Sequence, residues 1–100
     1  MPKVSVHVAH DKQPDDALAI VQPALEKTVR DFQGRDLEVD WQDTRGTFSF
    51  KSMAFTIKGH VAIQDEAVVV DIDLPFAAMM FKEKAEKALK KNISRAFEQA

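Results

Sequence analysis

The sequence predicts an α+β fold in the order β-α-β-β-β-β-α, a five-stranded, mostly antiparallel sheet with two helices packed on one face (helix-grip-like). Three observations predict it. Apolar and polar residues alternate in five short runs, which is the period of a half-buried strand. Two longer stretches repeat apolar residues every three or four positions, the period of an amphipathic helix. Short links join the last four strand-like runs and favour an antiparallel meander.

The first two elements follow one another directly. Val4, Val6 and Val8 alternate with polar neighbours, and a helix then begins at Pro14, where a missing N–H costs nothing. We expect Gly34 to end this helix in a left-handed conformation. Pro23 lies inside the pattern, so the sequence predicts either a kink near residues 19–23 or two short helices.

Four further strands follow the helix. Their cores lie at residues 37–42, 47–51, 55–63 and 68–74, with turns at 43–46, 52–54 and 64–66. The crossover helix makes the first strand parallel to the second, and the meander makes the fifth antiparallel to the first. We therefore expect the sheet order 2-3-4-5-1. We interpret Gly59, in mid-strand, as a bulge or a close approach of the long helix, and Trp41 as a core residue.

The last element is predicted as one helix from about Phe76 to Glu98, roughly 35 Å long. Its buried stripe consists of Ala78, Phe81, Ala85, Leu89, Ile93, Ala96 and Phe97. Its first six residues, FAAMMF, are all apolar. At about 100° per residue, Met80 lies opposite Leu89 and Phe76 lies about 140° away from it, so both should be exposed.

Exposed, clustered apolar side chains usually mark a partner surface. The candidate partner-binding residues are Phe76, Met79, Met80, Lys84, Lys87 and Lys91. The alternative is that Phe76 precedes the helix and folds back over the end of the sheet, which would leave Met80 as a lone surface residue.

Composition and charge limit the class of protein. The 100 residues are 45% hydrophobic and 30% charged, so we expect one folded α+β domain over residues 1–100. The chain has no cysteine, which excludes disulfides and thiolate chemistry. A net charge of −2 argues against a nucleic-acid partner. Neither a transmembrane segment nor a signal peptide is indicated, so we expect a cytoplasmic protein.

Residues that could carry chemistry do not form a known motif. His7, His60, Asp71 and Asp73 alternate onto the polar face of the sheet, but no metal-ligand spacing such as HExxH links them. We interpret them, with His10, as solvated side chains. We therefore predict no catalytic residues, no metal and no cofactor.

One resemblance adds a context. The VSVHVAH strand, the helix beginning PDDALAIVQPALEKTV, and the passage VVVDIDLPFAAMMFKEKAEKALKKNI resemble the small bacterial polyhydroxyalkanoic acid system (granule-region) proteins. The resemblance covers residues 4–97 and implies a cytoplasmic bacterial protein associated with storage-polyester granules. It brings no catalytic residues, because the family has no agreed ones.

Three functions remain open at this point. The first is a non-enzymatic module whose apolar helix start binds a polyester granule surface, a granule protein or a second copy of the chain. The second is a carrier of a small acyl or hydroxyacyl ligand, in a cavity between the sheet and the long helix that Trp41, Phe48, Phe50 and Phe55 would line. The third, an enzyme of polyester metabolism, lacks a nucleophile–base motif.

Overall fold

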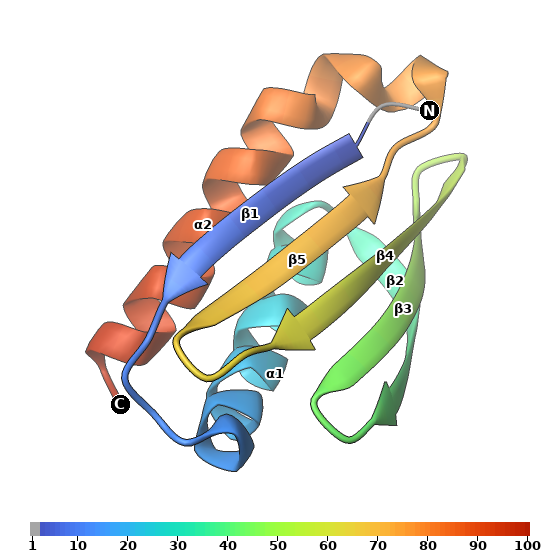
Figure 1. Ribbon diagram of the computed structural model, residues 1–100. Helices are drawn as coiled ribbons and strands as arrows, with labels where there is room; N and C mark the ends of the chain where they lie inside the picture. Colours follow the sequence, from blue (N-terminus) through green and yellow to red (C-terminus); the bar gives the residue numbers. More distant parts are fainter. Residues whose placement is uncertain (1–2) are drawn as a thin grey trace.

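The computed structural model describes residues 3–100 and has the predicted order of elements (Figure 1). The strands are β1 (Lys3–Ala9), β2 (Gly34–Gln42), β3 (Arg45–Ser52), β4 (Phe55–Ile63) and β5 (Ala67–Asp73). The helices are α1 (Pro14–Asp31), the short 3₁₀ helix η1 (Phe76–Phe81) and α2 (Lys82–Glu98).

All five strands form one sheet in the order β1-β5-β4-β3-β2, and every neighbouring pair is antiparallel. This confirms the predicted order, read from the opposite edge. The register places apolar residues opposite one another, as in the pairs Val4–Ile72 and Val6–Val70. Because successive side chains alternate between faces, one face of the sheet becomes apolar and the other polar.

Both helices lie on the apolar face, where α1 and α2 also contact each other (Figure 1). The core therefore sits between the sheet and the helix layer. Its largest fully buried side chains are Leu89, Ile93, Val4, Val21, Val61, Val68 and Val70. The opposite face of the sheet is uncovered and carries exposed polar side chains, including His7 and His60. The two layers are therefore those that the sequence predicts.

Helix α1 runs without interruption through Pro23, so the predicted alternative of two short helices is wrong. Pro23 cannot donate a hydrogen bond to the carbonyl of Ala19, four residues earlier. Both residues are exposed, so this carbonyl lies on the side of the helix that faces solvent. Water can hydrogen-bond to it there, which explains how the helix continues past the proline.

Two glycines have different roles from those predicted. The left-handed residue after α1 is Gln33, at a φ of 56°, and Gly34 already belongs to β2. Position 34 has no room for a side chain, because a Cβ there would lie 2.5 Å from a methyl carbon of Val29. At Gly59 the close neighbour is the ring of Phe48, 2.4 Å from an added Cβ, and not the long helix. The predicted bulge at Gly59 is absent, because the register of β4 with β3 and with β5 continues without a shift.

The only bulge among the described residues lies in β2, an edge strand of the sheet. The pairing with β3 shifts between Arg35 and Glu38, and Asp36 adopts a φ of 56°. A bulge bends and twists an edge strand, which discourages pairing with another chain. Trp41 is half-buried at this edge and packs against the core, as predicted.

Candidate functional site

The segment FAAMMF does not continue the C-terminal α-helix. It forms η1 over Phe76–Phe81, and α2 begins only at Lys82, so the predicted single helix from Phe76 is wrong. No side chain in η1 can cap a helix end, and Pro75 at its start has no N–H to donate. The tighter turn changes which residues share a side.

In a 3₁₀ helix, side chains three residues apart lie directly above one another. Ala78 and Phe81 therefore share one edge of η1, which faces inward: Ala78 is buried and Phe81 half-buried. Phe76 and Met79 share a second edge. Met80 lies on the third edge with Ala77, and both outer edges face solvent.

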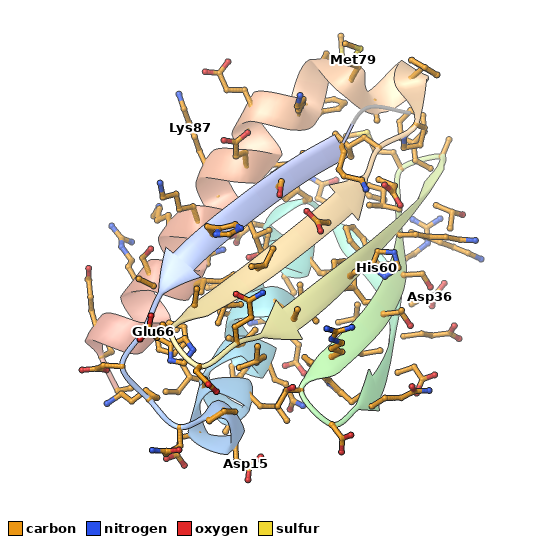
Figure 2. All side chains as sticks on the ribbon, viewed as in Figure 1. Asp15, Asp36, His60, Glu66, Met79 and Lys87 are labelled. Atoms are coloured by element: carbon orange, nitrogen blue, oxygen red, sulfur yellow. The ribbon has the colours of Figure 1, made fainter. Side chains whose placement is uncertain are left out.

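Three large apolar side chains are consequently exposed on one short segment, and we call Phe76, Met79 and Met80 the η1 patch. Their exposed fractions are 72%, 53% and 80%, respectively. Figure 2 shows Met79 at the end of the molecule, projecting away from it. The exposure of Phe76 excludes the alternative in which its ring folds back over the end of the sheet.

A basic surface adjoins the η1 patch. Met80 borders a shallow hollow with Lys84, Lys87 and Lys91, together with Glu83 and Ala88. All three lysines are exposed, and Figure 2 shows Lys87 projecting outward from α2. Lys87 forms an ion pair with Glu83 at 3.3 Å. The structure thus brings Met80 and the three predicted lysines to one surface, beside Phe76 and Met79.

A cavity of about 150 Å³ lies directly behind η1. The elements around it are η1, the first half of α2, the last two turns of α1 and the turn between β3 and β4. Its lining is mostly apolar. The sheet contributes Phe48, Phe50, Phe55, Ile57 and Ile72, and Leu74 follows directly after β5.

Small side chains on the helical side leave this space open. Ala78 and Ala85 line the cavity together with Phe81 and Leu89 of the same stripe, whereas Ile93, farther along α2, is fully buried and does not line it. The sequence raised a cavity between sheet and helix only as part of the carrier alternative, and it did not indicate this cause. The alanines at these two stripe positions are the feature of the sequence that could have located it.

Three of the four predicted lining residues are correct. Phe48, Phe50 and Phe55 line the cavity, and Trp41 does not. Trp41 instead lies against Gly46, whose added Cβ would be 2.7 Å from the indole ring. The indole therefore covers the backbone of the neighbouring strand, away from the cavity.

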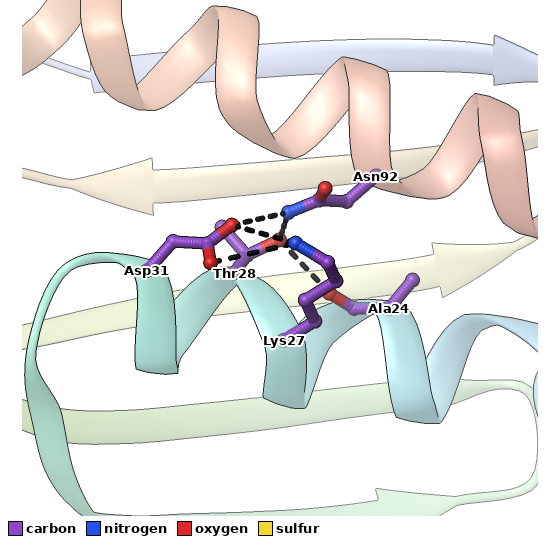
Figure 3. Close-up of polar contacts among 5 residues, drawn as sticks. All are labelled: Ala24, Lys27, Thr28, Asp31 and Asn92. Carbon is purple, nitrogen blue, oxygen red and sulfur yellow. Dashed lines mark hydrogen bonds and ion pairs between the residues drawn. The ribbon is translucent and has the colours of Figure 1, made fainter.

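A polar network fixes the two helices beside the cavity (Figure 3). The buried Asn92 amide donates hydrogen bonds to Thr28 Oγ1 at 2.8 Å and to Asp31 Oδ2 at 3.1 Å. The Thr28 hydroxyl donates to the carbonyl oxygen of Ala24 at 2.8 Å. Lys27 Nζ lies 3.3 Å from Asp31 Oδ2. The hydrogen bond from Asn92 is the main cause that lowers the pKa of the Asp31 carboxyl from its ordinary value of 3.8, and Lys27 adds to it.

Of the residues that the sequence offers for acid–base or metal chemistry, His60 and Asp71 are opposite one another in the register of β4 and β5. His7 and His60 are exposed on the uncovered sheet face, where Ser5 donates a hydrogen bond to Asp71 Oδ1 at 2.7 Å. His10 follows the last residue of β1, at the end of the molecule away from η1. Its Nε2 lies 2.8 Å from the carbonyl oxygen of Gln64. Among residues 3–100, no three His, Asp or Glu side chains are grouped closely enough to hold a metal ion.

Comparisons with known proteins show a family and a likeness to solved structures. A family model described as "Putative polyhydroxyalkanoic acid system protein" matches residues 4–97. The crystal structure of TTHA0849 from Thermus thermophilus is similar at a TM-score of 0.36 and 10% sequence identity, covering 97% of this chain and 92% of that one. No curated protein gives a significant match.

Proposed function

The chain belongs to the family of polyhydroxyalkanoic acid system proteins, and within it we propose a non-enzymatic accessory protein that attaches to the surface of polyester granules. The attachment site is the η1 patch, with the lysines beside it. This role involves no chemical step, only the burial of apolar side chains at an interface.

The observation that carries the proposal is the exposure of three large apolar side chains on one six-residue segment. Full burial of a Phe or Met side chain stabilises a contact by about 1.5–3 kcal/mol. Methionine also adapts to irregular surfaces, because its side chain is unbranched and flexible. A polyester surface is apolar and lacks fixed pockets, so it suits this kind of contact.

The lysines support attachment at a boundary between polymer and water. Lys84, Lys87 and Lys91 lie at positions i, i+3 and i+7 of α2, which face the same side of a helix. A segment with apolar side chains on one part and lysines on the next can lie along an amphiphilic boundary. The apolar residues would enter the surface layer while the ammonium groups stay hydrated.

The proposal places the protein in the cytoplasm, where such granules are stored. Within residues 3–100, no helix is both long and apolar enough to cross a membrane. Attachment through a surface patch accordingly requires no spanning segment.

The test is the location of a tagged copy in polyester-accumulating cells, combined with sedimentation of the purified protein with protein-free polyester particles. We expect label at the rim of granules and co-sedimentation with the bare particles. Uniform cytoplasmic label would contradict the proposal. Label at granules without binding to bare particles would assign the patch to a granule protein, and a stable dimer in solution that does not bind particles would assign it to a second copy.

A specific observation also favours a second function, that of a carrier for a small acyl ligand. The cavity behind η1 lies between the sheet and the helices, and five phenylalanines line it. Ligand pockets in proteins are typically concave, mostly apolar and few in number. The two functions use opposite sides of η1, so each can be tested without the other.

A further inference from the structure

We propose that the cavity behind η1 binds the alkyl chain of a short aliphatic monocarboxylic acid, with the carboxylate at the mouth beside Lys84. This inference rests on the carrier function and names its class of ligand. It shares Lys84 with the proposed attachment surface, but the ligand contacts the inner edge of η1, whereas attachment uses the outer edges.

The volume sets the length of the chain. An apolar cavity of about 150 Å³ in a protein core stays dry and accepts a molecule the size of benzene, which has six carbons. The cavity here has the same volume and is lined mainly by Phe, Ile, Leu and Ala side chains. A chain of about six carbons therefore fits, and a long fatty acid does not.

The chemistry of the lining excludes a polar group deep in the cavity. Its two buried hydroxyls are already committed: Thr28 donates to the carbonyl oxygen of Ala24, and Ser52 donates to that of Phe32 at 2.7 Å. No side chain in the described part of the chain has a buried polar atom without a partner. Neither buried hydroxyl can therefore donate to a ligand, so a hydroxyl at the far end of a ligand would lose its hydration and find no side-chain hydroxyl to donate to it.

The charges at the mouth favour an anionic head group. Two charged residues line the cavity, Asp31 and Lys84, and both are exposed. The Asp31 carboxylate is already engaged by Lys27 and Asn92. Lys84 forms no ion pair with any residue of the described chain. Its ammonium group is therefore available to a carboxylate, and a 3-hydroxyl close to that carboxylate would also remain at the solvated mouth.

The test measures binding of four six-carbon probes to the full chain by calorimetry and by the rise in Tm. Hexanoate and 3-hydroxyhexanoate should bind, because both keep an apolar tail and an anionic head. 6-Hydroxyhexanoate should bind at least about tenfold more weakly, since its terminal hydroxyl would be buried without a partner. Hexylamine should also bind more weakly than hexanoate, because Lys84 repels it.

Matched variants locate the site. Ala85→Leu fills the cavity and should abolish hexanoate binding in a folded protein; Ala78→Val is the smaller alternative should that variant not fold. Lys84→Glu should weaken hexanoate binding about threefold to tenfold. Lys90→Glu makes the same charge change on α2 but borders a hollow at the other end of the helix, and should have no effect.

The possible failures are distinguishable. Equal binding of hexanoate and hexylamine, or of hexanoate and 6-hydroxyhexanoate, would overturn the assignment of the ligand class and leave the carrier function standing. Unchanged hexanoate binding in a folded variant with a filled cavity would overturn the site. Absence of binding by all four probes would overturn both the ligand class and the carrier function, whatever the result of the granule experiments.

Discussion

The two ends of the helix layer are built from the same stripe of α2 and η1 but pack in different ways. At the far end, which is the C-terminal half of α2, Ile93 is fully buried. The ring of Phe97 stacks there on His10, with the ring centroids 5.2 Å apart. At the near end, next to η1, two of the inward positions hold the small side chains of Ala78 and Ala85, and a cavity lined by them and by Phe81 remains open. The comparison teaches that the volume of the side chains on this stripe, and not its periodicity, decides where the fold is solid.

The largest effect is expected from Ile93→Ala at the solid end. Removing most of a fully buried side chain from a well-packed region typically costs about 2–5 kcal/mol in the free energy of unfolding. Urea denaturation of the variant and the wild type gives this difference directly. A cost below about 1 kcal/mol would mean that the far end is no better packed than the near one.

A smaller effect is expected from Asn92→Ala, between the two ends. The substitution removes two hydrogen bonds and leaves a small space, at a cost of about 1–3 kcal/mol. Asn92→Leu keeps the volume without the amide and serves as the control. A stability of Asn92→Leu equal to that of the wild type would show that packing alone joins the helices.

The same contact predicts a dependence on pH. Because the folded state lowers the pKa of Asp31, its contribution to stability is complete above the unfolded value of 3.8 and is lost as pH falls through the folded value. Asn92 is the main cause, so the difference in stability between the wild type and Asn92→Ala should shrink on acidification below about pH 4. Denaturation at pH 7 and pH 3 measures it. A difference that stays constant or grows would contradict the assignment.

At the near end, Ala85→Leu should raise the free energy of unfolding by up to about 1–2 kcal/mol, because the added carbons enter an existing cavity. The matched control is Ala96→Leu, where a half-buried alanine of α2 already packs against the core. There the extra volume should cost stability. A loss at Ala85 as large as that at Ala96 would show that the near end has no usable space.

Much of the fold was predictable from the sequence, because alternation and helical period are local properties. They gave the five strands, the order of the sheet and the face on which the helices pack. They also gave the exposure of Phe76 and Met80, although the reasoning assumed an α-helix. Local patterns did not show that residues 76–81 form a 3₁₀ helix, since both kinds of helix accept an apolar run of six.

Features that depend on neighbours in space could not be predicted in the same way. The requirement for glycine at position 59 comes from the ring of Phe48 on the adjacent strand, and the left-handed turn falls on Gln33, not on Gly34. The cavity likewise arises from two alanines facing strands far away in the sequence. Of the candidate site, the sequence therefore identified the exposed residues better than the enclosed space behind them.

The smallest expected effect on stability is that of Met80→Glu, and it tests the central claim about the η1 patch. Met80 is 80% exposed, so its replacement should change the free energy of unfolding by no more than about 0.5 kcal/mol. Ala19→Glu makes the same change of charge at an exposed position of α1 and is the control.

The decisive measurement is co-sedimentation of the wild type, Met80→Glu and Ala19→Glu with protein-free polyester particles. Burying an unpaired carboxylate at an apolar contact is costly, so Met80→Glu should bind at least about tenfold more weakly, while Ala19→Glu binds as the wild type does. Equal binding by all three proteins, with Met80→Glu fully folded, would contradict the account.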